Sequence, residues 1–524
     1  DDLHLELAAA GTNNAKLNVL WNKIAGITLL DPACGCGNFL VVAYRELRRI
    51  EFEILKRLHR KEVAGGQSAL PFDVSTVSKL SVERMHGIEI LPFPAEIAQL
   101  SLWLVDHLAN IELGDYFGAP FAKLPLTEAP HIIMGNALRL NWESVVPKNK
   151  LSYILGNPPF LGKKEQSKEQ KEDMVSVWGN EKGTGVLDYV SCWYKKAGDL
   201  IHGTHIAVAF VSTNSITQGE QVGILWPWLL ARGIKIHFAH RTFKWGNEAS
   251  RKAAVHCVII GMGNFDIPHK TLFDYPDSDS EAHRIDVSNI NPYLVDAPDV
   301  VVTHRTRPLG NAPLMSYGSM AIDSGSLILS SEDAQKIAQE CPKMTHFIRP
   351  FMGGEEFLNG SKRFCLWLKD AAPEDVRACV SVRIRIESVR MFRENSNRQA
   401  TKKLAETPYR FGEIRQPECD YILIPKVSSE SRRYLPIGIV HPEVIASGSA
   451  LIIEKSNLFV FGVISAMMHM AWMRSVCGRL ESRYQYSAQI VYNNFPWPAK
   501  PADAQKKAVE GATQKVLDAR AKFA

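Results

Sequence analysis

A short apolar run, a glycine turn and an amphipathic helix together constrain the fold of this chain more than any other feature. Residues 27–31 read Ile-Thr-Leu-Leu-Asp, and residues 32–37 (Pro-Ala-Cys-Gly-Cys-Gly) form a turn. Over residues 38–58 apolar side chains recur at steps of three and four, which is typical of an amphipathic helix. Strand, turn and helix in this order predict the first half of a parallel α/β unit.

The same pattern recurs downstream of this first unit. Further short apolar runs, which we interpret as strands separated by helical crossovers, cover residues 85–90, 131–134, 152–155, 205–211, 234–239 and 254–261. The run at 205–211 (His-Ile-Ala-Val-Ala-Phe-Val) is apolar almost throughout, as in a strand that is covered on both faces. We therefore expect an α/β domain of about seven strands over residues 27–265, preceded by a helical lead-in over residues 1–26.

The length of 524 residues exceeds what one hydrophobic core supports, so further domains must follow. Residues 266–300 are rich in Asp, Pro, Ser and Asn, which predicts a linker. Residues 301–450 hold short apolar runs broken by Gly and Pro, which predicts a mixed, β-rich second domain. Residues 451–524 are expected to form a C-terminal helical region. Its apolar run at 458–473 is too short for a membrane span, so we interpret it as a buried helix and expect no membrane partner.

The composition excludes a disordered chain, a collagen-like chain and a small disulfide-rich scaffold. The hydrophobic fraction of 46% and the charged fraction of 22% are ordinary for a globular protein. Nine cysteines without a C-x-x-C pair indicate a reduced, cytoplasmic environment. The 16 histidines form no H-E-x-x-H motif and no Cys/His metal spacing, so we expect no metal site.

The net charge is only +5, but residues 383–410 alone carry eight basic and three acidic side chains, which is the same excess of five positive charges. Such a local basic face can follow phosphates, although a solvated helix surface explains it as well.

The first segment that carries chemistry is Asp-Pro-Ala-Cys-Gly-Cys-Gly-Asn-Phe at residues 31–39. Gly35 and Gly37 permit a tight turn and let a ligand approach the backbone. The turn follows a strand, and open α/β sheets bind their ligands at the carboxyl ends of strands. Asp31 could accept hydrogen bonds from an ammonium group. Position 40 is Leu, so the third glycine of the dinucleotide fingerprint is absent and NAD or FAD is not favoured.

The second segment is Gly-Asn-Pro-Pro-Phe at residues 156–160, again after an apolar strand. The two prolines fix the backbone and remove two N–H donors. The Asn157 side-chain oxygen and the Pro158 carbonyl then form a rigid pair of acceptors, and Phe160 offers a flat stacking surface. Such a pair suits a planar group that bears an –NH₂, such as the exocyclic amine of a base. A proline-rich loop with a core Phe is the structural alternative.

Together and in this order, the two segments resemble the class I S-adenosylmethionine-dependent N6-adenine DNA methyltransferases of the gamma class. The cofactor motif D-P-A-C-G-x-G-x-F matches residues 31–39, and the catalytic motif N-P-P-[FY] matches residues 157–160. Residues 482–487 (Ser-Arg-Tyr-Gln-Tyr-Ser) and 492–498 (Tyr-Asn-Asn-Phe-Pro-Trp-Pro) resemble the C-terminal region of MmeI-like type IIL restriction–modification enzymes. The resemblance implies a Rossmann-like methyltransferase fold with a C-terminal mixed α/β target-recognition domain. It also implies S-adenosylmethionine as the cofactor and double-stranded DNA as the partner.

The resemblance also implies roles for individual residues. Glu89 would bind the ribose hydroxyls of the cofactor, although it follows Asp31 by more than the ~20 residues of dinucleotide motifs, so we expect an insertion near residues 59–80. Asn136 would lie near the cofactor adenine, and Asp188 is a further pocket candidate. The catalytic candidates are Asn157, Pro158, Pro159 and Phe160. The candidates for cofactor binding are Asp31, Pro32, Ala33, Cys34, Gly35, Gly37, Asn38, Phe39, Glu89, Ile90, Asn136, Ala137 and Asn157.

Target reading is expected in residues 301–450, where Arg, Ser, Asn and Tyr mix in a composition suited to phosphate and base-edge contacts. The candidates for DNA binding are Arg305, Arg307, Arg383, Arg385, Lys402, Lys403, Arg432 and Arg433. MmeI-like enzymes carry an N-terminal nuclease, for which no room precedes residue 31. The Glu169-Gln170-Lys171 triplet has no strand-borne acid before it. We expect that a nuclease, if the full-length protein has one, lies outside this sequence.

Two other functions remain open from the sequence. N-P-P-[FY] motifs also serve methyltransferases that act on RNA or on protein glutamine, because both substrates offer a planar –NH₂; the long C-terminal region argues against those smaller enzymes. A non-catalytic DNA-binding module could have kept the fold without turnover, but the intact Asn157, Pro158 and Phe160 argue against that.

Overall fold

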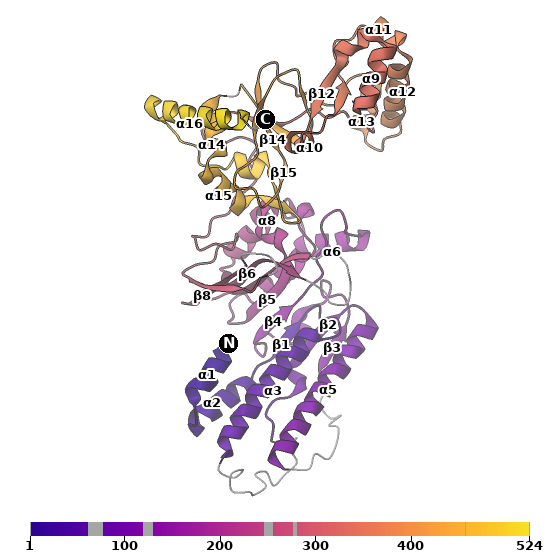
Figure 1. Cartoon of the computed structure of the whole chain (residues 1–524). Coiled ribbons are helices and arrows are strands. Elements are labelled where there is room, and N and C mark those ends of the chain that lie inside the picture. Colours follow the sequence, from indigo (N-terminus) through magenta and orange to yellow (C-terminus); the bar gives the residue numbers. More distant parts are fainter. Residues whose placement is uncertain are drawn as a thin grey trace. The chain divides into compact units, whose positions relative to one another are not determined.

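The structure is a computed structural model that describes residues 2–60, 77–118, 129–245, 255–275, 280–455 and 457–522. The chain forms two compact units (Figure 1). Unit 1 comprises Asp1–Thr217 and Gln221–Val301, and unit 2 comprises Gln218–Glu220 and Val302–Ala524.

A nine-stranded sheet with the order β3-β2-β1-β4-β5-β7-β6-β8-β9 forms the centre of unit 1. Strands β3, β2, β1, β4 and β5 are mutually parallel, whereas β7 runs antiparallel to both of its neighbours, β5 and β6. The strands are β1 (Leu29–Asp31), β2 (Met85–Glu89), β3 (His131–Met134), β4 (Tyr153–Gly156), β5 (Ala207–Thr213), β6 (Lys235–Trp245), β7 (Val255–Gly263), β8 (Lys270–Asp274) and β9 (His283–Val287).

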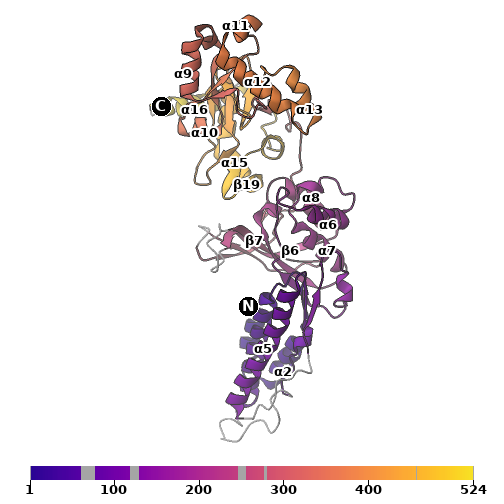
Figure 2. The same ribbon diagram turned by 90° about the vertical axis from the view of Figure 1, so that its right-hand side faces the viewer.

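Helices cover both faces of this sheet. Successive strand residues point to opposite faces, so Leu29 packs in one core and Leu30 in another. The core of Leu29 includes α1 (Asp2–Ala10), α2 (Asn14–Ala25), α3 (Asn38–Leu58) and α5 (Pro92–Phe117), and α3 lies beside α5 (Figure 1). The core of Leu30 includes α6 (Lys168–Trp178), α7 (Ser191–Leu200) and α8 (Gly219–Ala231), which gather on the other side (Figure 2).

The α/β sheet predicted from the sequence is present, and it is larger than expected. All seven predicted strands form, but β8 and β9 lie within residues 266–300, so the predicted linker is wrong there. β8 pairs in parallel with β6, and β9 closes the sheet as its last strand. Four of the five β9 residues are exposed, and a polar strand of this kind has no apolar run that would reveal it. The lead-in over residues 1–26 is helical, and buried Leu17, Leu20 and Ile24 make it part of unit 1.

Unit 2 is a mixed α/β unit with three small sheets, ordered β10-β18-β14-β16, β11-β13-β12-β17 and β15-β20-β19. Its strands are β10 (Met315–Tyr317), β11 (Ile328–Leu329), β12 (Ile348–Met352), β13 (Phe364–Leu366), β14 (Tyr421–Pro425), β15 (Val427–Ser428), β16 (Gly438–Val440), β17 (Ile445–Ala446), β18 (Ala450–Glu454), β19 (Gly478–Leu480) and β20 (Arg483–Gln485). Its helices are α9 (Ser331–Glu340), α10 (Gly354–Asn359), α11 (Pro373–Ala378), α12 (Val380–Glu394), α13 (Gln399–Lys403), α14 (Leu458–Ser465), α15 (Met467–Val476) and α16 (Asp503–Ala521).

The predicted boundary between residues 450 and 451 does not divide the structure. β18 is an interior strand that pairs with both β10 and β14, so the sheet spans that position. β20 also pairs with β15 across it, and β19 extends that sheet by pairing with β20. Pairing between strands far apart in the chain leaves no local signal in the sequence. The 451–524 region is therefore continuous with the preceding domain instead of forming a separate helical region.

The apolar run at residues 458–473 forms two helices instead of the one expected. α14 ends at Ser465 and α15 begins at Met467, and the pair is bent by 56°. Met470 and Met473 are buried, but Met467 and Met468 are exposed, so only part of this methionine cluster packs in the core. Among the described residues no single helix is long and apolar enough to cross a membrane. The bent pair α14 and α15 taken together has the length and apolar composition of a span, and nothing beyond length and composition points to one.

Candidate functional site

The two chemistry-bearing segments meet at the point where the strand order of the sheet reverses. In the sheet, β1 pairs with β2, the next strand along the chain, on one side and with β4 on the other side. Open α/β sheets bind ligands at such a switch point, outside the carboxyl ends of the strands. β1 ends at Asp31 and β4 ends at Gly156. A Cβ atom at Gly156 would lie only 2.5 Å from Asp31 Oδ1, so glycine is required for this close approach.

Backbone hydrogen bonds hold the glycine loop between the ends of β1 and β2. Ala33 N–H donates to Asp31 Oδ1 at 3.0 Å, and Cys34 N–H donates to the Ile88 carbonyl at 3.1 Å. Gly37 has a left-handed φ of 81°, and a Cβ there would lie 2.9 Å from the Ala98 Cβ. Only glycine fits both constraints, and it lets α3 begin directly at Asn38.

The Asp31 carboxylate is fully buried and only half satisfied. Its Oδ1 accepts the Ala33 N–H, whereas its Oδ2 has no hydrogen-bond partner among the described residues. Burial raises the pKa of Asp31 to about 7, the nearby Glu89 carboxylate raises it further, and the Ala33 N–H opposes the shift. A buried acceptor without a partner is costly, so a cationic donor that reached this oxygen would be bound strongly.

Glu89 connects the glycine loop with the start of α5. Its Oε2 accepts the Gly35 N–H at 2.9 Å, and its Oε1 accepts the Leu91 N–H at 2.9 Å. Each carboxylate oxygen keeps a free lone pair, so the side chain can still accept hydroxyl groups. The neighbouring Ile90 is 60% exposed.

Asn136 is fixed by a polar network that the sequence did not reveal. Its Nδ2 donates to Asp173 Oδ2 at 2.9 Å, and its Oδ1 accepts the Leu138 N–H at 2.9 Å. Asp173, a buried residue of α6, also accepts from Arg139 Nε at 2.7 Å and from the Tyr189 hydroxyl at 2.8 Å. These donors hold the pKa of Asp173 below its usual value despite burial, so it remains a carboxylate that orients Asn136.

The catalytic candidates follow β4 directly. Asn157 Oδ1 is buried and has no hydrogen-bond partner among the described residues. Pro158 is buried, Pro159 is exposed, and half-buried Phe160 packs against the core of α6, α7 and α8. The loop therefore presents a second unsatisfied acceptor at the same edge of the sheet as Asp31 Oδ2.

Asp188 anchors this loop and does not stand free in a pocket. Its Oδ1 accepts the Leu161 N–H at 2.9 Å and the Val190 N–H at 3.2 Å. The Tyr189 N–H in turn donates to the Leu161 carbonyl at 3.1 Å, which ties the two segments together. Burial raises the pKa of Asp188 to about 6. Its role in the structure is to position the backbone that follows Phe160.

The remaining candidates around the glycine loop divide into packed and accessible residues. The Pro32 carbonyl accepts from Trp193 Nε1 of α7 at 3.1 Å, a contact that sequence reasoning missed. Cys34 and Ala137 are buried, and the Cys34 Sγ lies so close to Gly87 that a Cβ there would be 2.7 Å away. The accessible or partly accessible candidates are Ala33, Gly35, Asn38 and Phe39.

The basic candidates of unit 2 also divide into accessible and internal side chains. Arg385 is engaged within the unit, where it pairs with Asp333 at 3.0 Å and donates to the Ser326 carbonyl at 3.0 Å. Arg305, although exposed, donates to Asn494 Oδ1 at 2.8 Å. The other exposed candidates are Arg307, Arg383, Lys402, Lys403, Arg432 and Arg433.

Arg393, counted in the basic stretch of residues 383–410, is not part of any surface. Its side chain is fully buried and donates to five backbone carbonyls. The acceptors are the carbonyls of Ala321, Ile322, Leu404, Thr407 and Arg410, at 2.7–3.0 Å. The basic surface is therefore smaller than the sequence count indicates, and this arginine has a structural role.

Arg432 and Arg433 lie at a cavity of about 470 Å³ in unit 2. Tyr434 and Arg520 also line it, and the Arg433 guanidinium lies 5.5 Å from the Tyr434 ring centroid. Three arginines beside an aromatic ring form a basic, partly apolar surface.

Comparisons with known proteins agree with this division into two units. The MmeI DNA-methyltransferase domain matches residues 7–274, and the MmeI target recognition domain matches residues 296–499. DNA methyltransferase A of Bacillus subtilis (strain 168) is 38% identical over 524 residues, covering 99% of this chain and 58% of that protein. The solved structure of the type IIL restriction-modification enzyme MmeI in complex with DNA matches with a TM-score of 0.92 at 47% identity. That match covers 100% of this chain and 69% of the solved chain.

Proposed function

Because the chain belongs to the MmeI family of DNA methyltransferases, we propose that it transfers a methyl group from S-adenosylmethionine to the N6 atom of an adenine at a specific DNA site. It would act as the modification and specificity part of a type II restriction–modification enzyme. One observation carries the proposal: two buried acceptors without a partner among the described residues, Asp31 Oδ2 and Asn157 Oδ1, lie at the carboxyl ends of two adjacent parallel strands.

The residues at the switch point fit S-adenosylmethionine, which supplies an electrophilic methyl group on a sulfonium. The unsatisfied Asp31 Oδ2 suits its α-ammonium group, and the glycine loop at Gly35 and Gly37 leaves the backbone accessible. Glu89 retains acceptor capacity for the ribose hydroxyls, and Asn136 is held in one orientation by Asp173 for contact with the adenine.

The Asn157 loop suits the other reactant. The N6 lone pair of adenine is delocalised into the ring, so the amine is a weak nucleophile. Hydrogen bonds from its two protons to Asn157 Oδ1 and to the Pro158 carbonyl favour a pyramidal nitrogen whose lone pair is free to attack. The contribution of this loop is positioning and preorganised dipoles, which act without reorganisation at the moment of reaction.

The base must leave the duplex to reach this loop, because its N6 edge is inaccessible in the stack. Phe160 is half-buried beside Asn157 and would stack on the extruded ring. The match of unit 2 to a target recognition domain favours DNA over RNA or protein glutamine as the substrate. The exposed arginines of unit 2 would then supply phosphate and base-edge contacts.

The test is transfer of a labelled methyl group from S-adenosylmethionine. Double-stranded DNA, RNA and a glutamine-containing peptide are offered as separate acceptors, and the labelled product is digested and identified. We expect label in DNA alone, as N6-methyladenine at a single sequence context. Label on cytosine, on RNA or on the peptide, or no transfer at all, would contradict the proposal.

A further inference from the structure

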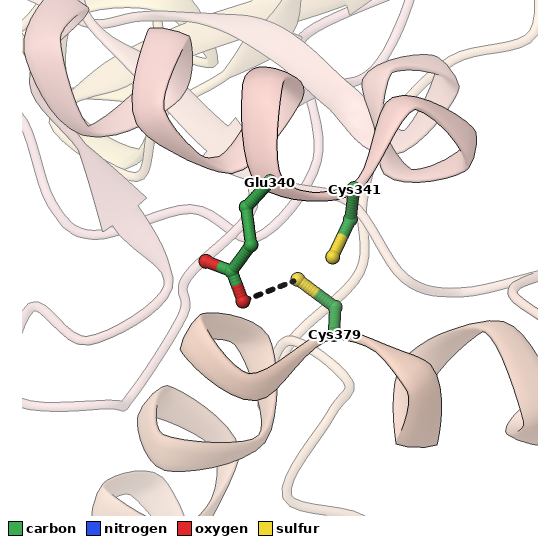
Figure 3. Close-up of side chains that lie close together, drawn as sticks. All are labelled: Glu340, Cys341 and Cys379. Carbon is green, nitrogen blue, oxygen red and sulfur yellow. Dashed lines mark hydrogen bonds between the residues drawn. The ribbon is translucent and has the colours of Figure 1, made fainter.

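Three side chains of unit 2 with metal-ligating atoms converge between α9 and α12. Glu340, Cys341 and Cys379 place a carboxylate oxygen and two thiol sulfurs within 4.8 Å of one another (Figure 3). Among the described residues this is the one group of three or more His, Cys, Asp or Glu side chains whose ligand atoms lie this close together. The sequence did not predict it, because Cys341 and Cys379 are far apart in the chain.

The fold positions each of the three residues at a helix end. Glu340 is the last residue of α9, Cys341 caps its C-terminus, and Cys379 precedes the first residue of α12. Cys379 is fully buried, Cys341 is half-buried, and Glu340 is exposed. The cluster is thus open to solvent on the Glu340 side and enclosed on the Cys379 side.

The Glu340 carboxylate is oriented toward the thiols by bonds it already makes. Its Oε1 accepts the Ser381 N–H at 3.1 Å and the Cys379 Sγ–H at 3.8 Å, and its Oε2 accepts the Ser381 hydroxyl. A carboxylate held in this way loses little conformational freedom when it binds a cation. The same bonds satisfy N–H groups at the start of α12, so Glu340 also acts there as a helix cap.

The chemistry of the donor set selects among metal ions. Two sulfurs and one carboxylate oxygen match the ligands of Zn²⁺, whereas Mg²⁺ and Ca²⁺ require sites made of oxygen alone. Three protein ligands leave the fourth tetrahedral position for water or another ligand. We propose that Glu340, Cys341 and Cys379 form a binding site for one Zn²⁺ ion, which fastens the end of α9 to the start of α12.

Binding of the ion replaces protons on the thiols. Zn²⁺ binding releases these protons, as for other thiolate sites. The site is separate from the methyl-transfer residues of unit 1, so it does not depend on the proposed function. Zn²⁺ binding is expected to stabilise unit 2, which contains α12 and its exposed Arg383.

The experiment uses the whole chain, stripped of metal and kept reduced, and titrates it with Zn²⁺ alone. We expect one equivalent to bind, and substitution of Co²⁺ to produce the absorption of cobalt–thiolate charge transfer. Cys341→Ser and Glu340→Gln should each weaken binding by at least tenfold, which is the lower end of the effect of perturbing a metal site. The thermal midpoint should rise on adding Zn²⁺ in the wild type and not in Cys341→Ser.

Matched variants separate this site from other thiols. Cys419→Ser removes an exposed thiol of the same unit, and Cys36→Ser removes one from the glycine loop; both should retain one equivalent of Zn²⁺. Cys379→Ser is the stronger test, but it alters a buried position. If Cys379→Ser does not fold, the test uses Cys341→Ser, because Cys341 is only half-buried. Unchanged affinity in both Cys341→Ser and Glu340→Gln would overturn the proposal.

Discussion

At the scale of single residues, the site depends on acceptors that the fold leaves unsatisfied. Asp31 and Asn157 each bury an oxygen without a partner among the described residues. Unsatisfied buried acceptors reduce the stability of the ligand-free protein. A ligand that donates hydrogen bonds to them removes this free-energy cost. The free chain therefore carries a strain of electrostatic origin at the place where cofactor and base are proposed to bind.

Asp31→Asn should stabilise the ligand-free chain at high pH. The folded-state pKa of Asp31 rises from 3.8 to about 7, so the folded chain holds this proton more tightly than the unfolded chain. Stability from this group is therefore lost as the pH rises from about 4 to 7, by on the order of 4 kcal/mol at most. Urea unfolding without cofactor should show the variant more stable than wild type at pH 8, with a smaller difference at pH 5.

The same substitution should weaken binding of S-adenosylmethionine, because the neutral amide cannot form an ion pair with an ammonium group. The exposed Asp115→Asn of α5 serves as the control and should change neither property. Equal stability of wild type and Asp31→Asn at pH 5 and pH 8 would show that Asp31 is not the strained carboxylate described above.

The chemistry-bearing motifs could be predicted from the sequence, but the residues that support them could not. Local order along the chain identified Asp31 and Asn157, because Asp31 ends an apolar strand and Asn157 directly follows another. Asp173 and Trp193 were missed, because each acts through a contact with a residue far away in the chain, Asn136 and Pro32 respectively. Asp188 was identified as polar and nearby, but its bonds to two backbone N–H groups became visible only in the structure.

At the scale of secondary structure, periodicity predicted strands that are apolar and missed strands that are not. The parallel strands β1, β2, β4 and β5 are mostly buried and therefore form apolar runs, and β3 is a further apolar run at one edge. β9 lies at the other edge and is largely exposed, so its residues resemble a linker. In unit 2, strands of two to five residues are joined by pairing that is distant in the sequence, which explains why its internal boundaries could not be predicted.

Arg393→Met should destabilise the part of unit 2 built around α12. The guanidinium donates to five buried or partly buried carbonyls, and a thioether donates to none of them. Three of these carbonyls also accept backbone N–H groups, so among the described residues those of Ile322 and Arg410 depend on Arg393 alone. Since each buried, unsatisfied carbonyl costs about 1–3 kcal/mol, we expect a loss of about 2 kcal/mol or more in the free energy of unfolding. Arg390→Met, at an exposed position of the same helix, is the matched control and should cost little. Similar denaturation midpoints for the two variants would contradict the structural role of Arg393.

At the scale of the whole molecule, each unit carries a different part of the proposed activity. Unit 1 holds the residues proposed to bind the cofactor and the target base, and unit 2 holds the arginines and lysines proposed to contact DNA. The modest net charge of +5 conceals this division, because charge of both signs is spread over the chain. Non-specific affinity for DNA should therefore depend on local basic groups of unit 2.

Replacing Arg432 and Arg433 together by Ala should weaken DNA binding and its salt dependence. Each phosphate contact contributes about 0.9 to the slope of log affinity against log salt concentration, so two lost contacts reduce the slope by about 1.8. Binding titrations at several salt concentrations measure this slope. The control replaces Arg45 and Arg49 of α3 by Ala, which changes the net charge equally within unit 1. A slope that is unchanged in the Arg432/Arg433 pair, or reduced equally in both pairs, would remove these arginines from the DNA interface.

Methyl transfer by Asn157→Ala tests the central claim most directly. The substitution removes the unsatisfied Asn157 Oδ1 but leaves the glycine loop and unit 2 unaltered, and Asn18→Ala on the exposed face of α2 is the control. Loss of one preorganised acceptor predicts a fall in kcat of about 100-fold or more, with the affinities for S-adenosylmethionine and DNA within a few-fold of wild type. Near-normal turnover in Asn157→Ala, with the labelled methyl group still on adenine N6, would contradict the account.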